Sequence, residues 1–308
     1  MTHSRYPIER QAVRIFRMAF SLHISRHKLN FGDMKRIVTC ILTLLLLVSA
    51  AVAVNAQNYP FKGGEQLDFK LQVKAGVSID IGSGSFRIEE EGSNYHLDMK
   101  LKSNSFVSSL YRLDHVYQSH FTRSGLVPVR FHREAKEGSD YWVKSDYTFS
   151  NGGKKVHGKV QKSSRPAVEA DATFSNEVRD LASVFYVVRT LDFSKLAKTP
   201  ARYTVLMDRN IIDFEIRVVG KEVKKISGLG KFNTVKIALK GKSRGNFDTN
   251  ASKPFSNMSD AEDMIYFWLS DDECRAPLYF TAPVSFGALS GRCVSYKGLK
   301  YKLSSKIN

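Results

Sequence analysis

Two histidines on either side of a predicted turn are the residues best suited to hold a metal. His120 and His132 flank the stretch 123–128, so in one hairpin register they would face each other, with Asp114 or Glu134 as a carboxylate neighbour. Zinc sites need three or four ligands in tight geometry, and neither the H-x-x-x-H nor the C-x-x-C spacing occurs in residues 57–308. We therefore predict no metal site and no cofactor.

A second group of reactive side chains is an acidic cluster close to the C-terminus, made of Asp260, Glu262, Asp263, Asp271, Asp272 and Glu273. Paired carboxylates can supply acid and base catalysis on a glycoside, or bind calcium. The cluster lacks the twelve-position loop of an EF-hand, and carboxylates at strand ends are usually solvated or paired with basic residues. A hydrolase that uses the Asp271 and Asp272 region is therefore an alternative and not the main interpretation.

Nucleophile and phosphate-binding motifs are missing from the sequence. There is no G-x-S-x-G elbow and no G-x-x-x-x-G-K-[ST] loop. The glycine-containing stretches 82–85, 151–153 and 228–230 predict tight turns between strands instead. We therefore favour a protein without catalytic activity.

Aromatic side chains are abundant, with twenty Phe, thirteen Tyr and two Trp. A curved antiparallel sheet around such side chains can enclose an elongated cavity for one hydrophobic ligand, although ordinary core packing explains the same residues. The predicted ligand contacts are inward-pointing side chains: Phe69, Tyr147, Phe214 and Trp268 on strands, and Phe185 on a helix.

The elements that would position these side chains are mostly strands. Apolar and polar residues alternate with period two along most of the chain after Gln57, which is typical of half-buried strands. Residues 177–191 break this pattern, because their apolar residues recur with helical spacing, and Asn176 is a suitable N-cap. The prediction is a mainly β fold, an antiparallel β-barrel or curved half-barrel, with one amphipathic helix laid against or into its open side.

The N-terminal region resembles an export signal. Residues 34–56 combine a basic start, an apolar run and a small-residue cleavage site, which predicts a secretory signal peptide. A retained membrane anchor is the alternative. Residues 1–33 precede this signal, and we interpret them as a mis-assigned upstream start or as an extension. Residues 57–308 are predicted to form a single β domain in the periplasm or cell envelope.

The chain carries a net charge of +17, and residues 57–308 remain basic. Such a charge favours anionic envelope partners such as phospholipid head groups, lipopolysaccharide or acidic glycans, and it permits peripheral membrane contact. Basic residues that only solubilise strand faces and edges are the simpler explanation of the charge. Export argues against nucleic acid as the partner, and the sequence gives no oligomeric state.

Two cysteines remain after the predicted cleavage, Cys274 and Cys293. If the chain reverses near residues 286–287, Cys293 faces about residue 280, several positions away from Cys274. Cysteines whose Cα atoms are more than about 7 Å apart cannot be bridged without backbone movement. We therefore expect two buried free thiols, although an exported protein could form a disulfide.

Three segments resemble one protein family, in matching order along the chain: 61–67 (FKGGEQL), 179–189 (RDLASVFYVVR) and 267–272 (FWLSDD). They are similar to the exported bacterial domain-of-unknown-function family 3108, and the signal peptide resembles those of the Bacteroides group. The resemblance implies a single β domain in the envelope. It brings no activity, substrate or catalytic residues.

From these observations we expect an exported envelope protein that binds or carries a hydrophobic, lipid-like ligand without catalysis. The alternatives are a structural or assembly factor that contacts envelope polymer or another protein, and the hydrolase described above.

Overall fold

The structure is a computed structural model that describes residues 57–75, 77–110, 112–246, 264–284 and 287–307. These residues belong to one compact unit that begins at Gln57. The predicted signal peptide 34–56, the upstream residues 1–33 and the acidic residues Asp260, Glu262 and Asp263 lie outside the described residues.

Strands make up most of the described chain. They are β1 (Glu65–Ala75), β2 (Val77–Glu91), β3 (Asn94–Ser103), β4 (Leu113–Thr122), β5 (Pro128–Glu137), β6 (Tyr141–Ser150), β7 (Lys155–Lys162), β8 (Val168–Glu169), β9 (Ala172–Thr173), β10 (Val178–Asp180), β11 (Ala201–Met207), β12 (Asn210–Ile226), β13 (Gly230–Asn246), β14 (Ile265–Ser270), β15 (Pro277–Val284), β16 (Gly287–Lys297) and β17 (Lys306–Ile307). The described helices are α3 (Ser105–Leu110), α4 (Leu181–Thr190) and α5 (Phe193–Leu196).

The strands pair as two antiparallel series. Each strand from β1 to β7 pairs with the next, and we call this series the first half-sheet. Each strand from β11 to β16 likewise pairs with the next and forms the second half-sheet. The pairing of β16 with β1 joins the two.

The edges of this sheet are not joined. Strand β10 adds to β11 in parallel, and β8 and β9 add to β7. Among the described residues no pairing connects β10 with β8 or β9, so the sheet is an open, mixed and curved half-barrel. The mainly β half-barrel prediction is confirmed, and its closed-barrel variant is wrong.

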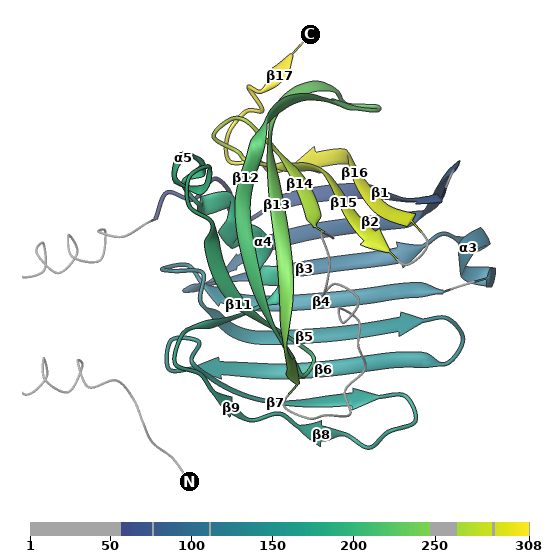
Figure 1. Ribbon diagram of the computed structural model, residues 1–308, viewed down its shortest axis with the longest axis vertical. Coiled ribbons are helices and arrows are strands. Elements are labelled where there is room, and N and C mark those ends of the chain that lie inside the picture. Colours follow the sequence, from purple (N-terminus) through teal and green to yellow (C-terminus); the bar gives the residue numbers. More distant parts are fainter. Residues whose placement is uncertain (1–56, 76, 111, 247–263, 285–286, 308) are drawn as a thin grey trace, which may run out of the picture. The chain divides into compact units, whose positions relative to one another are not determined.

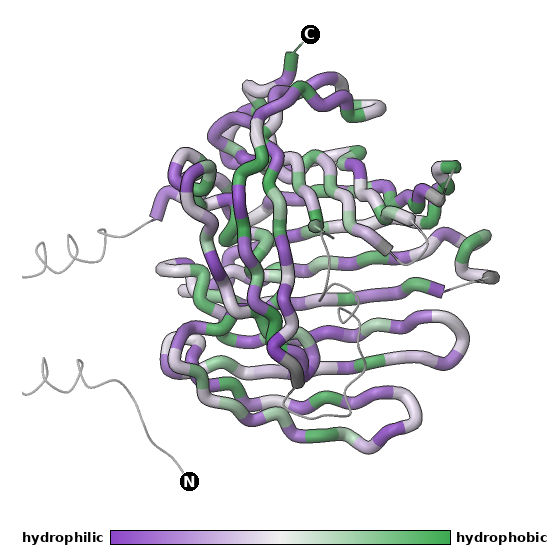
Figure 2. The backbone as a smooth tube through the Cα atoms, viewed as in Figure 1, coloured by the Kyte–Doolittle hydropathy of each residue, from purple (hydrophilic) through white to green (hydrophobic). Residues whose placement is uncertain are grey.

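Alternating side chains give the strands one face toward the core and one face toward solvent. In β7 exposed and buried residues alternate strictly, and β6 follows nearly the same pattern. Figure 2 shows the same alternation of hydrophilic and hydrophobic residues along the strands. In Figure 1 β12 and β13 run across the strands of the first half-sheet, and α4 lies between the two half-sheets, next to β11. We call the face of each half-sheet that is turned toward α4 its inner face.

The helix α4 is shorter than predicted and is capped by another residue. It spans Leu181–Thr190, and its N-cap is Asp180, so the prediction of Asn176 as N-cap and of a helix over 177–191 is corrected. The three residues before the helix form β10, because they pair with residues 204–206 of β11. This pairing partner lies far away in sequence, which helical periodicity does not reveal.

Most of the helix is buried. Leu181, Phe185 and Thr190 are half-buried, and every other residue of α4 is buried. A helix that is surrounded by protein needs apolar or paired residues on all sides. Position between the half-sheets therefore explains why α4 has no polar, solvent-facing stripe.

Two of the predicted turns are confirmed and one is wrong. Residues 151–154 join β6 to β7, and Asn151, Gly152 and Gly153 all have positive φ. Residues 227–229 join β12 to β13. Residues 82–85 are not a turn but lie inside β2, where a Cβ atom on Gly82 would come within 2.0 Å of the Lys102 carbonyl oxygen. Glycine at position 82 therefore allows the backbones of β2 and β3 to approach each other closely.

Both cysteines are free and buried, as expected. Phe280 faces Gly291 across the β15–β16 pair, so Cys293 lies further along β16, and Cys274 precedes β15. The Cys274 thiol donates to the Tyr301 carbonyl at 2.8 Å.

None of the helices among the described residues is long and apolar enough to cross a membrane.

Candidate functional site

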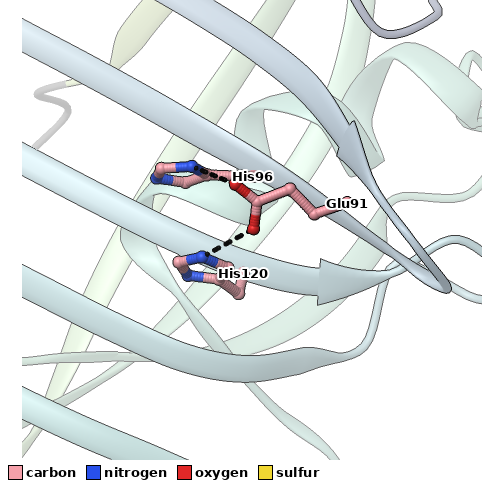
Figure 3. A group of neighbouring side chains, drawn as sticks. All are labelled: Glu91, His96 and His120. Carbon is pink, nitrogen blue, oxygen red and sulfur yellow. Dashed lines mark hydrogen bonds and ion pairs between the residues drawn. The ribbon is translucent and has the colours of Figure 1, made fainter.

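The outer face of the first half-sheet brings together a carboxylate and two imidazoles. His96 on β3 and His120 on β4 are register partners, and their rings stack with centroids 4.2 Å apart. Glu91, the last residue of β2, reaches both rings: its Oε1 lies 3.0 Å from His96 Nδ1 and its Oε2 lies 3.2 Å from His120 Nε2 (Figure 3). Burial and the neighbouring His96 lower the pKa of His120.

The predicted pairing of His120 with His132 is wrong. In the β4–β5 register His120 faces Arg130. His132 faces Gln118 and pairs with Asp146, with 2.7 Å between His132 Nδ1 and the Asp146 carboxylate. The histidine that joins His120 comes from the preceding strand, and sequence spacing around the predicted turn could not identify it.

A small apolar cavity lies between the half-sheets, next to α4. Its volume is about 30 Å³, and the atoms that face it are almost all carbon. The lining residues are Leu67, Phe69, Phe86, Phe185, Tyr186, Val188, Arg189, Leu239, Phe267, Leu269, Pro277 and Phe280.

Five of the lining phenylalanines form a closed circle of ring contacts, which we call the phenylalanine ring. Its members are Phe69, Phe86, Phe185, Phe267 and Phe280. Successive centroids around the circle lie 5.3, 5.9, 5.1, 5.9 and 6.1 Å apart, the last distance closing it from Phe280 to Phe69. These distances are within the range of favourable aromatic contacts. Residues from β1, β2, α4, β14 and β15 thus meet around one apolar space.

The cavity is smaller than expected. Sites for drug-sized ligands occupy about 300–1,000 Å³, and a void of the observed volume holds about one or two water molecules. The expectation of an elongated apolar cavity is therefore wrong for this conformation. A ligand with an acyl chain would need several of the rings to turn aside.

The position of the Phe280 ring depends on Gly291, its neighbour on β16. Phe280 is half-buried, and its side chain lies flat across Gly291. A Cβ atom on Gly291 would come within 1.9 Å of Phe280 Cε1. Any larger residue at position 291 would therefore force the ring to move.

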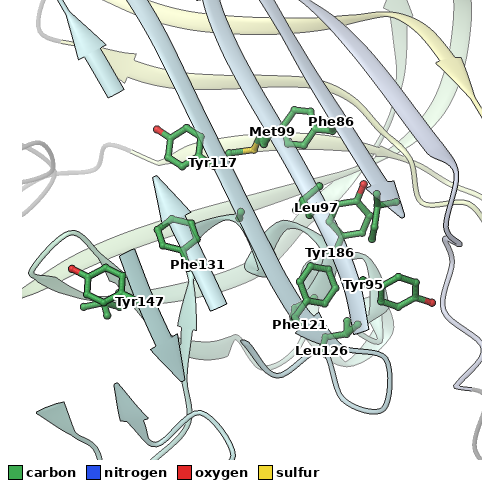
Figure 4. Packing of buried hydrophobic residues seen from close by; sticks show 14 of the residues in the cluster. Phe86, Tyr95, Leu97, Met99, Tyr117, Phe121, Leu126, Phe131, Tyr147 and Tyr186 are labelled. Atoms are coloured by element: carbon green, nitrogen blue, oxygen red, sulfur yellow. The ribbon is translucent and has the colours of Figure 1, made fainter. Parts of the chain in front are cut away.

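A buried ion pair borders the cavity. Arg189 of α4 donates from both Nη atoms to the two carboxylate oxygens of Glu65 on β1, and its Nη2 also donates to the Cys274 carbonyl at 3.0 Å. Tyr186 donates to Glu65 at 3.3 Å. Burial, and next the charge of Glu65, raise the pKa of Tyr186 well above its ordinary value. In Figure 4 Tyr186 is surrounded by apolar side chains of the first half-sheet.

Asp180 fixes the other end of α4. Its carboxylate accepts from the Ala182 and Ser183 amides at 2.9 and 2.8 Å and from Ser119 Oγ of β4 at 2.8 Å. Burial raises the pKa of Asp180, although these donors favour its ionised form. The helix is thus held at both ends by buried polar contacts to the first half-sheet.

A third buried polar group fixes the β11–β12 turn to the inner face. Asp208 accepts from Arg133 of β5 and from Ser145 of β6, each at 2.6 Å. Tyr147 donates to the Asp208 carbonyl, and Arg133 is almost fully buried. These partners explain why two charged residues are tolerated in the interior.

The five predicted ligand contacts are all buried or half-buried, but they do not meet at one place. Phe69 and Phe185 line the cavity. Tyr147 lies beside Asp208, and Phe214 does not line the cavity, although it belongs to the same core cluster as Phe267. Trp268 lies on the opposite face of β14 from Phe267. The role of these five residues in ligand binding stays a prediction.

The environment of Trp268 is polar and aromatic. Its indole donates to Glu222, its ring contacts Tyr279, and Lys224 Nζ lies 3.9 Å from a Trp268 ring centroid. Sequence reasoning missed Phe86, Phe267 and Phe280. The alternation of β14 places Phe267 and Trp268 on opposite faces, but it does not indicate which of the two faces is the inner one.

The two predicted hydrolase residues make structural contacts. Asp271 pairs with Lys221 at 2.8 Å. Asp272 accepts from Ser270 Oγ at 2.7 Å and from the Cys274 and Ser305 amides at 3.0 Å each. Asp272 thereby stabilises the β14–β15 turn and connects it to the C-terminal segment.

The fold and the cavity define a class of curved, open β proteins in which a half-barrel wraps around one buried helix. The chain belongs to the DUF3108 family, described as proteins of unknown function, whose sequence profile matches residues 68–294. The resemblance found in the sequence is therefore confirmed.

Two solved structures are similar to the chain. One is a β-barrel-like protein of the domain-of-unknown-function family DUF1849 from Brucella abortus, with 10% identity and a TM-score of 0.51; the match covers 77% of this chain and 98% of that one. The other is a candidate lipoprotein from Parabacteroides distasonis, with 10% identity and a TM-score of 0.32 over 79% of this chain and 99% of that one. At this identity the first likeness supports the fold alone. No curated protein matches the chain.

Proposed function

We propose that this protein is an exported cell-envelope protein that binds a hydrophobic, lipid-like ligand between its half-sheets and catalyses no reaction. The observation that carries the proposal is the phenylalanine ring, which surrounds an apolar space with side chains from five different elements. Export and a place in the periplasm rest on the signal peptide predicted at residues 34–56.

Binding requires the cavity to enlarge. Phe185 and Phe280 are half-buried, so their rings have more freedom than the fully buried members of the phenylalanine ring. Rotation of Phe280 away from Phe69 and Phe267 would open the space between β1 and β15. The basic charge of the protein would attract an anionic head group and would permit peripheral contact with a membrane.

The test is a titration with cis-parinaric acid, a fluorescent fatty acid. We expect saturable binding to the native protein, severalfold tighter binding to Phe280→Ala because the cavity is larger, and weaker binding to Phe185→Trp because it is filled. Phe149→Ala is the matched control, since Phe149 is a buried ring of the first half-sheet that does not line the cavity. Absence of saturable binding to all of these proteins, or equal effects of Phe149→Ala and Phe280→Ala, would contradict the proposal.

A structural or assembly role is the second candidate, favoured by a patch of aromatic and basic side chains on the outer face of the second half-sheet. Lys224 lies over Trp268 and Tyr279, and Lys236 lies over Tyr266. Trp268 itself is buried, but the half-buried Tyr266 and Tyr279 of this patch could stack on an envelope polymer or a partner protein. Crosslinking in cells should then trap a macromolecular partner, and Lys224→Glu should reduce its yield. An uncrosslinked monomer would count against this role.

A hydrolase that uses Asp271 and Asp272 has the least support, because both carboxylates already have structural partners. Asp271→Asn is the informative variant, since Asp271 pairs only at the surface with Lys221 and its loss should not unfold the protein. Hydrolysis of an envelope glycan by the native protein that disappears in Asp271→Asn would favour this alternative.

A further inference from the structure

We propose that Glu91, His96 and His120 form a binding site for one divalent transition-metal ion of the Zn²⁺ type on the outer face of the first half-sheet. This site is separate from the apolar cavity and does not depend on the proposed ligand. Each of the three residues offers one ligand atom, and these atoms all lie within 4.8 Å of one another.

The distances suit a single ion. Two ligand atoms bound at about 2.0–2.1 Å with a tetrahedral angle lie roughly 3.3 Å apart. The Glu91 oxygens lie 3.0 and 3.2 Å from His96 Nδ1 and His120 Nε2. Small side-chain rotations are therefore enough to place an ion between the three groups, and water would complete its coordination.

The backbone holds the ligands in place. His96 and His120 come from neighbouring positions of the β3–β4 ladder, so their separation is fixed by the strand pairing. Glu91 precedes the two-residue turn between β2 and β3, and its side chain lies across both rings (Figure 3). Ligands on paired strands need little reorganisation on binding, which lowers the entropic cost.

A second carboxylate is positioned to orient one of the imidazoles. Asp98 Oδ2 lies 3.7 Å from His96 Nε2, and Gln118 holds the other Asp98 oxygen at 3.0 Å. Within the part of the chain that the structure describes, His96 Nε2 is buried and makes no hydrogen bond. A short shift would let this nitrogen donate to Asp98, which leaves the Nδ1 lone pair for the ion, as in the carboxylate–histidine–metal arrangements of zinc proteins.

The charged side chains around the site favour a bound cation. Glu91 and Asp98 are next to the imidazoles, and Glu89 is the register partner of His96 on β2. Arg130, the register partner of His120 on β5, opposes them. Two imidazoles and a carboxylate suit Zn²⁺, Cu²⁺ or Ni²⁺, whereas Mg²⁺ and Ca²⁺ prefer oxygen ligands alone.

The experiment is a calorimetric titration of the untagged full chain with Zn²⁺, with Mg²⁺ as the ion control. The variants are His96→Gln, His120→Gln and Glu91→Gln, and the matched control is His132→Gln, which removes a histidine that pairs with a carboxylate on the neighbouring strand β6. We expect each of the first three to weaken one Zn²⁺ site at least tenfold and His132→Gln to leave it unchanged. The full chain also carries His23 and His27, which could bind additional Zn²⁺. The comparison between the variants, and not the number of ions bound, therefore identifies the site.

A second readout identifies the ligands directly. Zn²⁺ should shift the ring resonances of His96 and His120 in the NMR spectrum, and leave those of His132 and His157 in place. Equal Zn²⁺ affinity in the native protein and in all three variants, or loss of binding in His132→Gln alone, would overturn the proposal. A thermal unfolding curve for each variant verifies that it is folded, and the NMR shifts in the native protein test the site without any substitution.

Discussion

Glu65 on the first strand and Arg189 on the last turn of α4 form a two-pronged ion pair in the interior, although 124 positions separate them in the sequence. Burial acts against the charge of Arg189, but the charge and hydrogen bonds of Glu65 outweigh it, and the pKa of Arg189 lies above its ordinary value. Both side chains are almost completely buried. The pair therefore connects the helix to the strand at which the half-sheets join.

We expect removal of either partner to destabilise the protein strongly. Glu65→Leu or Arg189→Leu leaves an unpaired buried charge, which costs about 3–5 kcal/mol of the free energy of unfolding. The double variant should recover much of this loss, because it leaves neither charge unpaired. Urea denaturation of the four proteins measures the coupling, and additive losses in the double variant would show that the pair does not act as a unit.

The two cysteine thiols should be unreactive in the folded protein. Burial raises the pKa of Cys274 to about 11 and that of Cys293 to about 12. Because the thiolate is the reactive form, both groups should be almost entirely protonated and inaccessible at pH 8. A thiol reagent such as DTNB should label neither Cys274 nor Cys293 in native buffer and should label both of them in denaturant. Rapid labelling of either one under native conditions would contradict the burial described here.

Local sequence patterns predicted where the strands lie better than they predicted which residues face each other across neighbouring strands. Period two placed Phe69 on the inner face correctly, because one side of β1 must face the core. The same period cannot tell which face of β14 is the inner one, since Phe267 and Trp268 are both large and aromatic. The prediction placed Trp268 on the inner face, whereas Phe267 is the residue that lines the cavity. The β4–β5 register, in which His120 faces Arg130 and not His132, does not follow from the residue types around the turn.

The interior polar groups were not predictable for a related reason. Asp180, Asp208 and Arg189 look like ordinary solvent-exposed residues in the sequence. Each makes an interior contact with a side chain at least sixty positions away, namely Ser119, Arg133 and Glu65. Such contacts depend on the three-dimensional arrangement of the half-sheets, and the periodicity of the sequence carries no information about that arrangement.

Asp180 should give the folded protein a measurable pH dependence. Its pKa is raised in the folded state, chiefly by burial, so the folded protein binds this proton more tightly than the unfolded chain does. The resulting stabilisation is complete below the unfolded-state pKa of about 3.9 and is lost as the pH rises through the folded-state value. Asp180→Asn cannot ionise, so its stability relative to the native protein should increase as the pH rises from 4 to 7.

The same position tests the helix cap. Asp180→Ala removes the acceptor for the Ala182 and Ser183 amides and for Ser119, and it should cost about 1–3 kcal/mol at neutral pH. Asp180→Asn keeps one side-chain oxygen as acceptor and should cost less. Urea denaturation between pH 4 and 7 measures both effects. Equal losses for Asn and Ala, with no dependence on pH, would contradict the assigned role.

The contact between Gly291 and Phe280 gives the sharpest test of the apolar cavity. In Gly291→Ala the new Cβ would meet the Phe280 ring at 1.9 Å, so the ring must leave its position across β16 and turn toward the cavity. Forcing a packed ring out of place costs about 1–3 kcal/mol. In the Phe280→Ala background the same substitution should be close to neutral, because no ring remains to be displaced.

The four proteins of this cycle also separate stability from ligand binding. If Phe280 controls entry to the phenylalanine ring, Gly291→Ala should weaken cis-parinaric acid binding, and Phe280→Ala with Gly291→Ala should restore it to the level of Phe280→Ala alone. Stability is measured by urea denaturation and binding by fluorescence on the same samples. Gly291→Ala that destabilises the protein without any change in binding would show that the ring packs the core and does not control access to the cavity.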